Sequence, residues 1–135
     1  MKAPQPEWSI PENLLELVHG DEGGIWEDDS WDPILLTVMT GTVYKGRDKP
    51  LAWQIEFEPV GPRFEVANKK LMTQGLDPDG YGWATLIKNV AEKYYPDLAK
   101  ELQFDEELAA CVVWVESEDA CRQLIQMTWT LINVE

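Results

Sequence analysis

Basic side chains and histidine are scarce in this chain of 135 residues. Eleven Lys and Arg residues stand against 25 Asp and Glu residues, which gives a formal net charge of −14 at pH 7. This balance argues against nucleic-acid binding, because phosphate backbones are bound by basic surfaces. It favours attraction to a basic partner. The single histidine, His19, stands at the expected end of a helix, and without a partner motif it defines neither a catalytic triad nor a metal site.

Cysteine and long hydrophobic segments are also scarce. Cys111 and Cys121 are too few for a disulfide framework or a zinc site, and both fall within apolar patterns typical of unreactive core thiols. No hydrophobic stretch is long enough to cross a membrane, and residues 1–6 lack the apolar segment of a secretory signal. The sequence therefore predicts a cytoplasmic protein without a membrane partner.

The acidic side chains form no pattern that selects a catalytic, cofactor or metal site. The segment Asp77-Pro78-Asp79-Gly80 begins like a calcium-binding loop but lacks the closing glutamate, so a helix-capping role is predicted. Glu56 and Glu58 are spaced to lie on the same face of a strand. This pair leaves a small hydrolase open as an alternative, although an ordinary solvent-exposed face has the same pattern.

Hydrophobic periodicity predicts the element order α-β-β-β-α-β-α after an extended leader at residues 1–8. The predicted segments are a helix at 10–18 that ends at Gly20, strands at 34–44, 51–58 and 63–66, a helix at 83–94, a short helical turn at 97–102, a strand at 109–116 and a C-terminal helix capped by Ser117. The first two strands are expected to form an antiparallel hairpin around a turn at 45–50.

This order predicts an α+β fold. The strands are grouped first, and helices then bracket one more strand, which is typical of a mostly antiparallel sheet with helices packed on one face. We expect about four strands. No break in composition divides the chain, so residues 1–135 are predicted to form a single domain.

Residues 20–33 are predicted to form an acidic loop. This segment contains six acidic residues, two tryptophans and no basic residue. One interpretation is a solvated loop whose tryptophans pack into the core. The other is a contact surface for a basic protein, in which carboxylates steer the encounter and indoles fill pockets. The candidate contact residues are Asp21, Glu22, Trp26, Glu27, Asp28, Asp29, Trp31 and Asp32.

The stretch Asp79-Gly80-Tyr81-Gly82-Trp83, followed by an apolar helix that stops at Pro96, resembles the bacterial polymorphic-toxin immunity protein 51 family and its Gly-Tyr-x-Trp motif. The resemblance continues through residues 102–107 and 115–119 and covers roughly residues 64–132. Gly82 departs from it, because the family usually has an acidic residue at that position. The motif also has a structural interpretation, with Gly80 in a tight turn and Tyr81 and Trp83 packed in the core.

The resemblance implies an immunity protein, which binds a cognate toxin domain, blocks its active site or an adjacent surface, and is not an enzyme. The acidity adds a separate inference, because toxins that act on nucleic acid, such as nucleases, have basic clefts. An adaptor or regulatory interaction domain without a toxin partner is the alternative. Neither hypothesis requires a cofactor or a metal.

Overall fold

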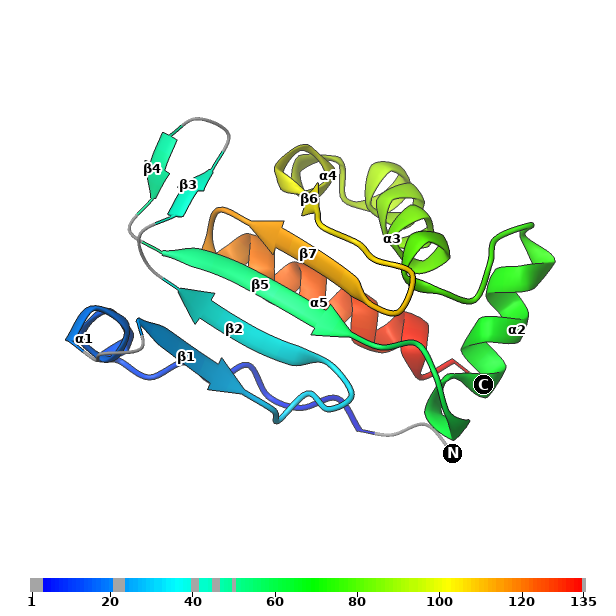
Figure 1. The fold of residues 1–135 in the computed structure, drawn as a ribbon, viewed down its shortest axis with the longest axis horizontal. Helices are drawn as coiled ribbons and strands as arrows, with labels where there is room; N and C mark the ends of the chain where they lie inside the picture. Colours follow the sequence, from blue (N-terminus) through cyan, green and yellow to red (C-terminus); the bar gives the residue numbers. More distant parts are fainter. Residues whose placement is uncertain (1–3, 21–23, 40–41, 45–46, 50, 135) are drawn as a thin grey trace.

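The computed structural model of the protein describes residues 4–20, 24–39, 42–44, 47–49 and 51–134 (Figure 1). Its helical elements are α1 (Leu14–Gly20), the 3-10 turn η1 (Pro62–Phe64), α2 (Glu65–Thr73), α3 (Gly80–Tyr94), α4 (Pro96–Glu101) and α5 (Glu118–Ile132). Its strands are β1 (Ile25–Asp28), β2 (Leu35–Met39), β3 (Thr42–Tyr44), β4 (Arg47–Lys49), β5 (Ala52–Phe57), β6 (Gln103–Phe104) and β7 (Cys111–Val115).

The main sheet has five strands in the order β1-β2-β5-β7-β6, and every neighbouring pair is antiparallel. Strands β3 and β4 pair separately as a small two-stranded sheet. The α+β prediction is therefore confirmed, with one strand more in the main sheet than expected. The predicted pairing of the first two long strands is confirmed by β2 and β5, and β7 lies between β5 and β6.

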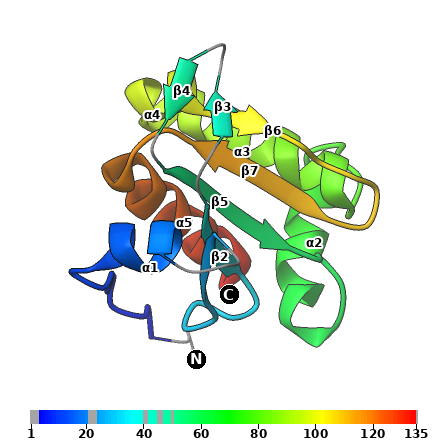
Figure 2. The same ribbon diagram turned by 60° about the vertical axis from the view of Figure 1, so that its left-hand side comes forward.

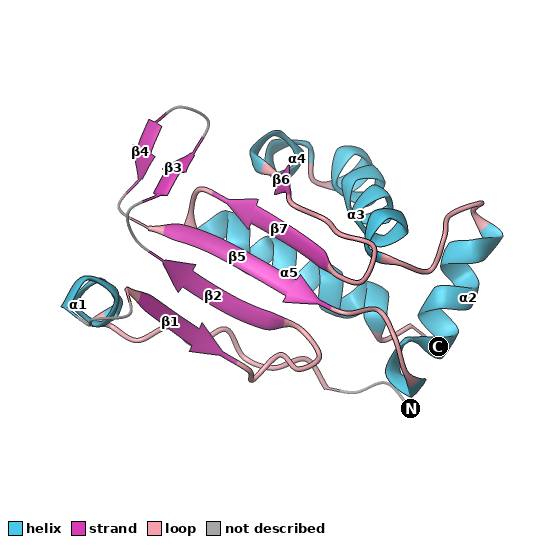
Figure 3. Ribbon diagram, viewed as in Figure 1, coloured by secondary structure: helices cyan, strands magenta, loops and turns pink. Residues whose placement is uncertain are grey.

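The two faces of the main sheet differ sharply. Figures 1 and 2 show α5 behind β5 and β7, and Figure 3 shows no described helix in front of β2, β5 and β7. Because side chains alternate along a strand, every second residue points toward the helices. These residues join the hydrophobic core and are almost completely buried: Leu36, Val38, Trp53, Ile55, Phe57, Cys111, Val113 and Val115.

The intervening residues form the other surface of the sheet, which we call the open face. Paired residues of an antiparallel sheet point to the same side, so the register identifies the members of this surface. They are Ile25, Glu27, Leu35, Thr37, Met39, Ala52, Gln54, Glu56, Gln103, Val112 and Trp114. None of them belongs to the hydrophobic core cluster.

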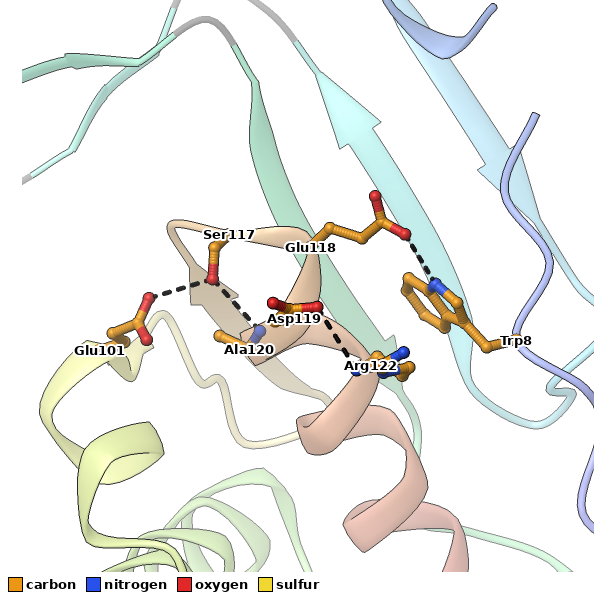
Figure 4. Close-up of polar contacts among 7 residues, drawn as sticks. All are labelled: Trp8, Glu101, Ser117, Glu118, Asp119, Ala120 and Arg122. Carbon is orange, nitrogen blue, oxygen red and sulfur yellow. Dashed lines mark hydrogen bonds and ion pairs between the residues drawn. The ribbon is translucent and has the colours of Figure 1, made fainter. Parts of the chain in front are cut away.

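Both long helices begin at side-chain caps, which satisfy backbone N–H groups that have no partner within the helix. The Asp79 carboxylate accepts a hydrogen bond from the Gly82 N–H at 2.9 Å, at the start of α3. The Ser117 hydroxyl accepts one from the Ala120 N–H at 3.2 Å, at the start of α5 (Figure 4). These caps, the apolar stripe of α3 and the short helix α4 after Pro96 confirm the predictions for residues 77–102 and 117–132.

The start of α5 is also where the N-terminal segment and α4 converge. The Trp8 indole N–H donates to Glu118 at 3.0 Å (Figure 4). The Trp8 ring also lies 6.2 Å from the Trp53 ring. From α4, Glu101 accepts a hydrogen bond from the Ser117 hydroxyl at 3.4 Å. Residues 4–8 contain no helix or strand, yet this indole fixes them against the sheet.

The predicted strand at 63–66 is wrong. Residues 62–64 form η1 and Glu65 begins α2. Phe64, Ala67 and Leu71 are buried while Val66 is 46% exposed, so the buried positions follow helical spacing. Four alternating residues did not distinguish a strand from the first turn of a helix, and Pro62 is well suited to that turn.

Other element boundaries also differ from the prediction. Helix α1 begins at Leu14, four residues later than expected, although it ends at Gly20 as predicted. The predicted strand at 34–44 is divided into β2 and β3, and the predicted turn at 45–50 contains β4. The predicted loop at 20–33 contains β1, which pairs along its whole length with β2. The two-residue strand β6 was not predicted.

Candidate protein-binding surface

The acidic segment does not form the single contact loop that was predicted. Because Ile25–Asp28 is a strand, its side chains point alternately to the two sides of the sheet. Trp26 is partly buried against the core, whereas Glu27 is exposed on the open face. Asp21 and Glu22 lie outside the described residues. The candidate side chains are therefore distributed over different surfaces.

Two of the acidic side chains are engaged within the protein. Asp28 accepts hydrogen bonds from the Ser30 N–H at 3.0 Å and from the Ser30 hydroxyl. Asp32 forms an ion pair with Arg63 at 3.5 Å, and the same guanidinium donates to the Asp32 carbonyl oxygen at 3.1 Å. The exposed carboxylates of Glu27 and Asp29 are better placed for a partner.

Trp31 cannot act as a surface anchor in this structure. Its relative exposure is 0%, and its ring packs edge-on against Trp129 at a centroid distance of 5.9 Å. The prediction of an exposed contact is therefore wrong for this residue. The driving force is the burial of a large apolar ring, which outweighs the acidic character of its sequence neighbours.

The open face offers a mixture of apolar and acidic side chains. Its central row, read across the sheet, is Glu27, Thr37, Gln54, Trp114 and Gln103. Trp114, Leu35 and Met39 are partly exposed there, and Glu56 provides a second carboxylate. Partly exposed aromatic and Met side chains are enriched at protein interfaces. Sequence patterns missed this surface because β7 is apolar on both sides.

A hollow of about 360 Å³ lies at one end of the open face. The residues that line it are Pro33, Leu35, Glu56, Phe57, Glu58, Val60, Arg63 and Phe64. Glu56 and Glu58 both line this depression, but Glu58 lies beyond the end of β5, so the two do not form the predicted pair on one face of a strand. Arg63 is held by Asp32 and lies 5.8 Å from the Trp129 ring, so this cation has a structural role.

A second concave region runs along the helical side of the molecule. A depression of about 590 Å³ is lined by uncharged residues, most of them on α3 and α5, including Val90, Tyr94 and Leu131. It shares Gln123 and Gln126 with an adjoining depression of about 520 Å³ that contains acidic residues of α4 and α5. No feature of the sequence pointed to this groove.

The two cysteines are core thiols, as predicted. Both are free and buried. Burial raises the pKa of the Cys111 thiol to about 12, with a smaller contribution from the nearby Glu106 carboxylate. Burial, and secondly Glu118, raises the pKa of Cys121 still further above its ordinary value. Both sulfur atoms therefore stay protonated at neutral pH and are poor nucleophiles.

Within the described ranges, no group of three or more His, Cys, Asp or Glu side chains is arranged to hold a metal ion. The described helices also include none that is long and apolar enough to cross a membrane. His19 is the penultimate residue of α1.

The Gly80-Tyr81-Gly82-Trp83 stretch combines a close backbone contact with core packing. A methyl group on Gly80 would lie 1.8 Å from the Glu107 carbonyl oxygen, so Gly80 is required by a close approach between segments and not by a tight turn. Trp83 is 0% exposed, and its indole N–H donates to Asn68 at 2.8 Å. Tyr81, predicted to pack in the core, is instead 52% exposed.

Comparison with known families identifies an immunity protein: a family model described as "Immunity protein 51" matches residues 54–133. Because this match covers more than half of the chain, the chain belongs to the immunity protein 51 family. The matched span begins within β5 and includes α3, β7 and α5, whereas α1, β1 and β2 precede it. No curated protein and no solved structure gives a significant match to the chain.

Proposed function

We propose that this protein binds a cognate bacterial toxin domain, neutralises it by covering its active site or an adjacent surface, and catalyses no reaction itself. Membership of the immunity protein 51 family is the observation that carries this proposal. The chemistry of the described residues is compatible with it, because the free thiols are buried and protonated. The action is proposed to take place in the cytoplasm.

The charge of the protein supports a basic toxin domain as its partner. With a net charge of −14, the protein accelerates encounter with a positively charged surface at low ionic strength. A nuclease fits this description, because its cleft must attract phosphates and would accept carboxylates in their place.

The acidic segment supports a steering role. Glu27 and Asp29 are exposed, whereas Asp28 and Asp32 are engaged with Ser30 and Arg63. We therefore propose that, among the described residues of this segment, Glu27 and Asp29 contribute most to the electrostatic attraction that steers the toxin domain toward the protein. Asp21 and Glu22 are proposed to add to the same acidic region.

The test of the proposed function is coexpression with the toxin domain encoded immediately upstream. We expect the protein to restore growth to cells that express the toxin domain and to copurify with it as a stable complex. If growth is not restored and no complex forms, the proposal is wrong.

A charge variant tests the steering role. The double variant Glu27→Gln/Asp29→Asn should associate more slowly with the toxin domain and show a flatter dependence on salt concentration. The matched control is Glu92→Gln/Asp97→Asn, which removes the same charge from exposed positions on α3 and α4. Equal association rates for the two double variants would show that the acidic segment has no special role.

A further inference from the structure

We propose that the open face of the sheet docks on the toxin domain, with Trp114 as its central anchor. This inference rests on the proposed function and adds the surface by which binding takes place. It concerns the side of the sheet opposite the helices (Figure 3).

Trp114 differs from the other tryptophans of the chain. Four of them, Trp31, Trp53, Trp83 and Trp129, are buried in the core, and Trp8 and Trp26 pack against that core. Trp114 alone is neither a member of the core cluster nor packed against it. Trp114 lies on β7, the strand next to the edge strand β6, and a partly exposed indole on a sheet face is the kind of residue that dominates binding energy at protein interfaces.

Trp114 is bordered on the open face by accessible polar side chains, although Thr37, Ala52 and Val112 of the same face are buried. Gln54 lies directly opposite it on β5, and Gln103 lies opposite it on β6. Glu56 and Val112, paired across the same two central strands, lie in the next row of the open face. These cross-strand neighbours are held rigidly by the sheet, so docking requires little ordering of the backbone.

The charge of the open face selects the kind of partner. Its two charged members, Glu27 and Glu56, are both acidic, and Glu58 lies in the hollow at its end. A second copy of this chain would place these carboxylates against a protein of the same net charge. A basic protein surface complements them, which agrees with the basic toxin domain proposed above.

The open face is smaller than a standard protein interface, and the acidic segment beside it adds to the contact area. The five strands contain 22 residues together, and a spacing of about 4.8 Å between strands with a rise of about 3.3 Å per residue gives a flat area of roughly 350 Å². A standard interface buries about 800 Å² on each partner. Because Thr37, Ala52 and Val112 are buried, the open face supplies less than half of such an interface, and strand β1, which is part of the acidic segment, extends it toward Asp29.

The groove on the helical side is the competing location. It contains Tyr94, which is 63% exposed, but the residues around Tyr94 in that depression are uncharged. Acidic residues do lie in the adjoining depression, but Asp119 is paired there with Arg122, and Glu101 accepts a hydrogen bond from Ser117. On the open face, Glu27 and Glu56 share one sheet surface with the Trp114 indole, and no basic residue is among the members of that surface. This difference favours the open face over the groove.

The experiment measures the dissociation constant of the complex with the purified toxin domain by titration calorimetry. We expect Trp114→Thr to weaken binding by at least about 30-fold, the threshold typical of a central anchor residue. The charge reversal Glu56→Lys should weaken it as well, and it leaves the indole in place. Tyr94→Thr is the matched aromatic control on the opposite side and should bind as the wild type does. Circular dichroism establishes that each variant is folded.

The possible outcomes separate this inference from the proposed function. If wild-type protein does not bind the toxin domain, the proposed function is wrong, and this inference falls with it. If the wild type binds and both Trp114→Thr and Glu56→Lys bind equally well, only the docking surface is wrong. Loss of binding in Tyr94→Thr alone would move docking to the groove. A wild-type dimer that Trp114→Thr converts to a monomer would show that a second copy occupies the open face.

Discussion

The substitution Gly80→Ala should destabilise the protein although it improves helix propensity. Gly80 is the first residue of α3, where alanine is intrinsically favoured by up to about 1 kcal/mol. The added methyl carbon, however, would lie 1.8 Å from the Glu107 carbonyl oxygen and 2.2 Å from that of Ala110. Ordinary contact begins at 3.4 Å, so this segment would have to retreat by 3.4 − 1.8 = 1.6 Å.

The cost of this retreat can be divided into two parts. Overpacking a close contact costs about 1–3 kcal/mol. The hydrogen bond from the Gly80 N–H to the Leu108 carbonyl oxygen, at 3.0 Å, would be weakened at a cost of about 1 kcal/mol. After subtracting the gain in helix propensity, we expect a net loss of about 2 kcal/mol in the free energy of unfolding.

Urea unfolding followed by tryptophan fluorescence measures this loss. The midpoint should fall while the slope m stays constant, because the exposed surface of the native and unfolded states is nearly unchanged. Asn89→Ala is the control, since it introduces alanine at an exposed site of the same helix and should be neutral or slightly stabilising. A Gly80→Ala variant as stable as the wild type would refute the role assigned to the close approach.

Three further predictions concern the core and the helix caps. Trp83→Phe should lower the free energy of unfolding by about 2 kcal/mol in a denaturant titration, because it removes the hydrogen bond to Asn68 and leaves unfilled volume; an unchanged midpoint would contradict this. Ser117→Ala should cost about 1 kcal/mol through loss of the α5 cap, whereas Ser117→Thr, which keeps the hydroxyl that caps α5 and donates to Glu101, should retain most of the stability in the same titration. The Cys111 thiol should resist a thiol reagent at pH 8 in the native protein and react at once in denaturant, since burial raises its pKa to about 12. The raised pKa also makes the free energy of unfolding depend on pH. The contribution of Cys111 is fully present below pH 9, the ordinary pKa of a cysteine thiol, and is lost as the pH rises through 12, because the thiol of the unfolded chain loses its proton at a lower pH than the thiol of the folded protein.

The elements that were correctly predicted from sequence have long and regular patterns. The apolar stripe of α3 extends over three turns, and the Ser117 cap marks the start of α5. The elements that were missed are short or depend on tertiary pairing. The four-residue strand β1 is mostly acidic and aromatic, and its pairing with β2 is visible only in three dimensions.

The candidate site was harder to predict than the fold. The acidic segment was noticed, but its sequence could not indicate that Trp31 is buried or that Asp32 pairs with Arg63, because both contacts involve residues distant along the chain. The outward orientation of Trp114 depends on the register between β7 and β5. An apolar strand does not reveal which of its faces packs against the helices.

The activity of the purified toxin domain, measured with increasing amounts of this protein, tests the central claim most directly. If the protein acts by occupying the toxin, activity should fall in proportion to the amount added and reach its minimum near one molecule per toxin domain. Full toxin activity in the presence of a large excess of folded protein would contradict neutralisation by binding.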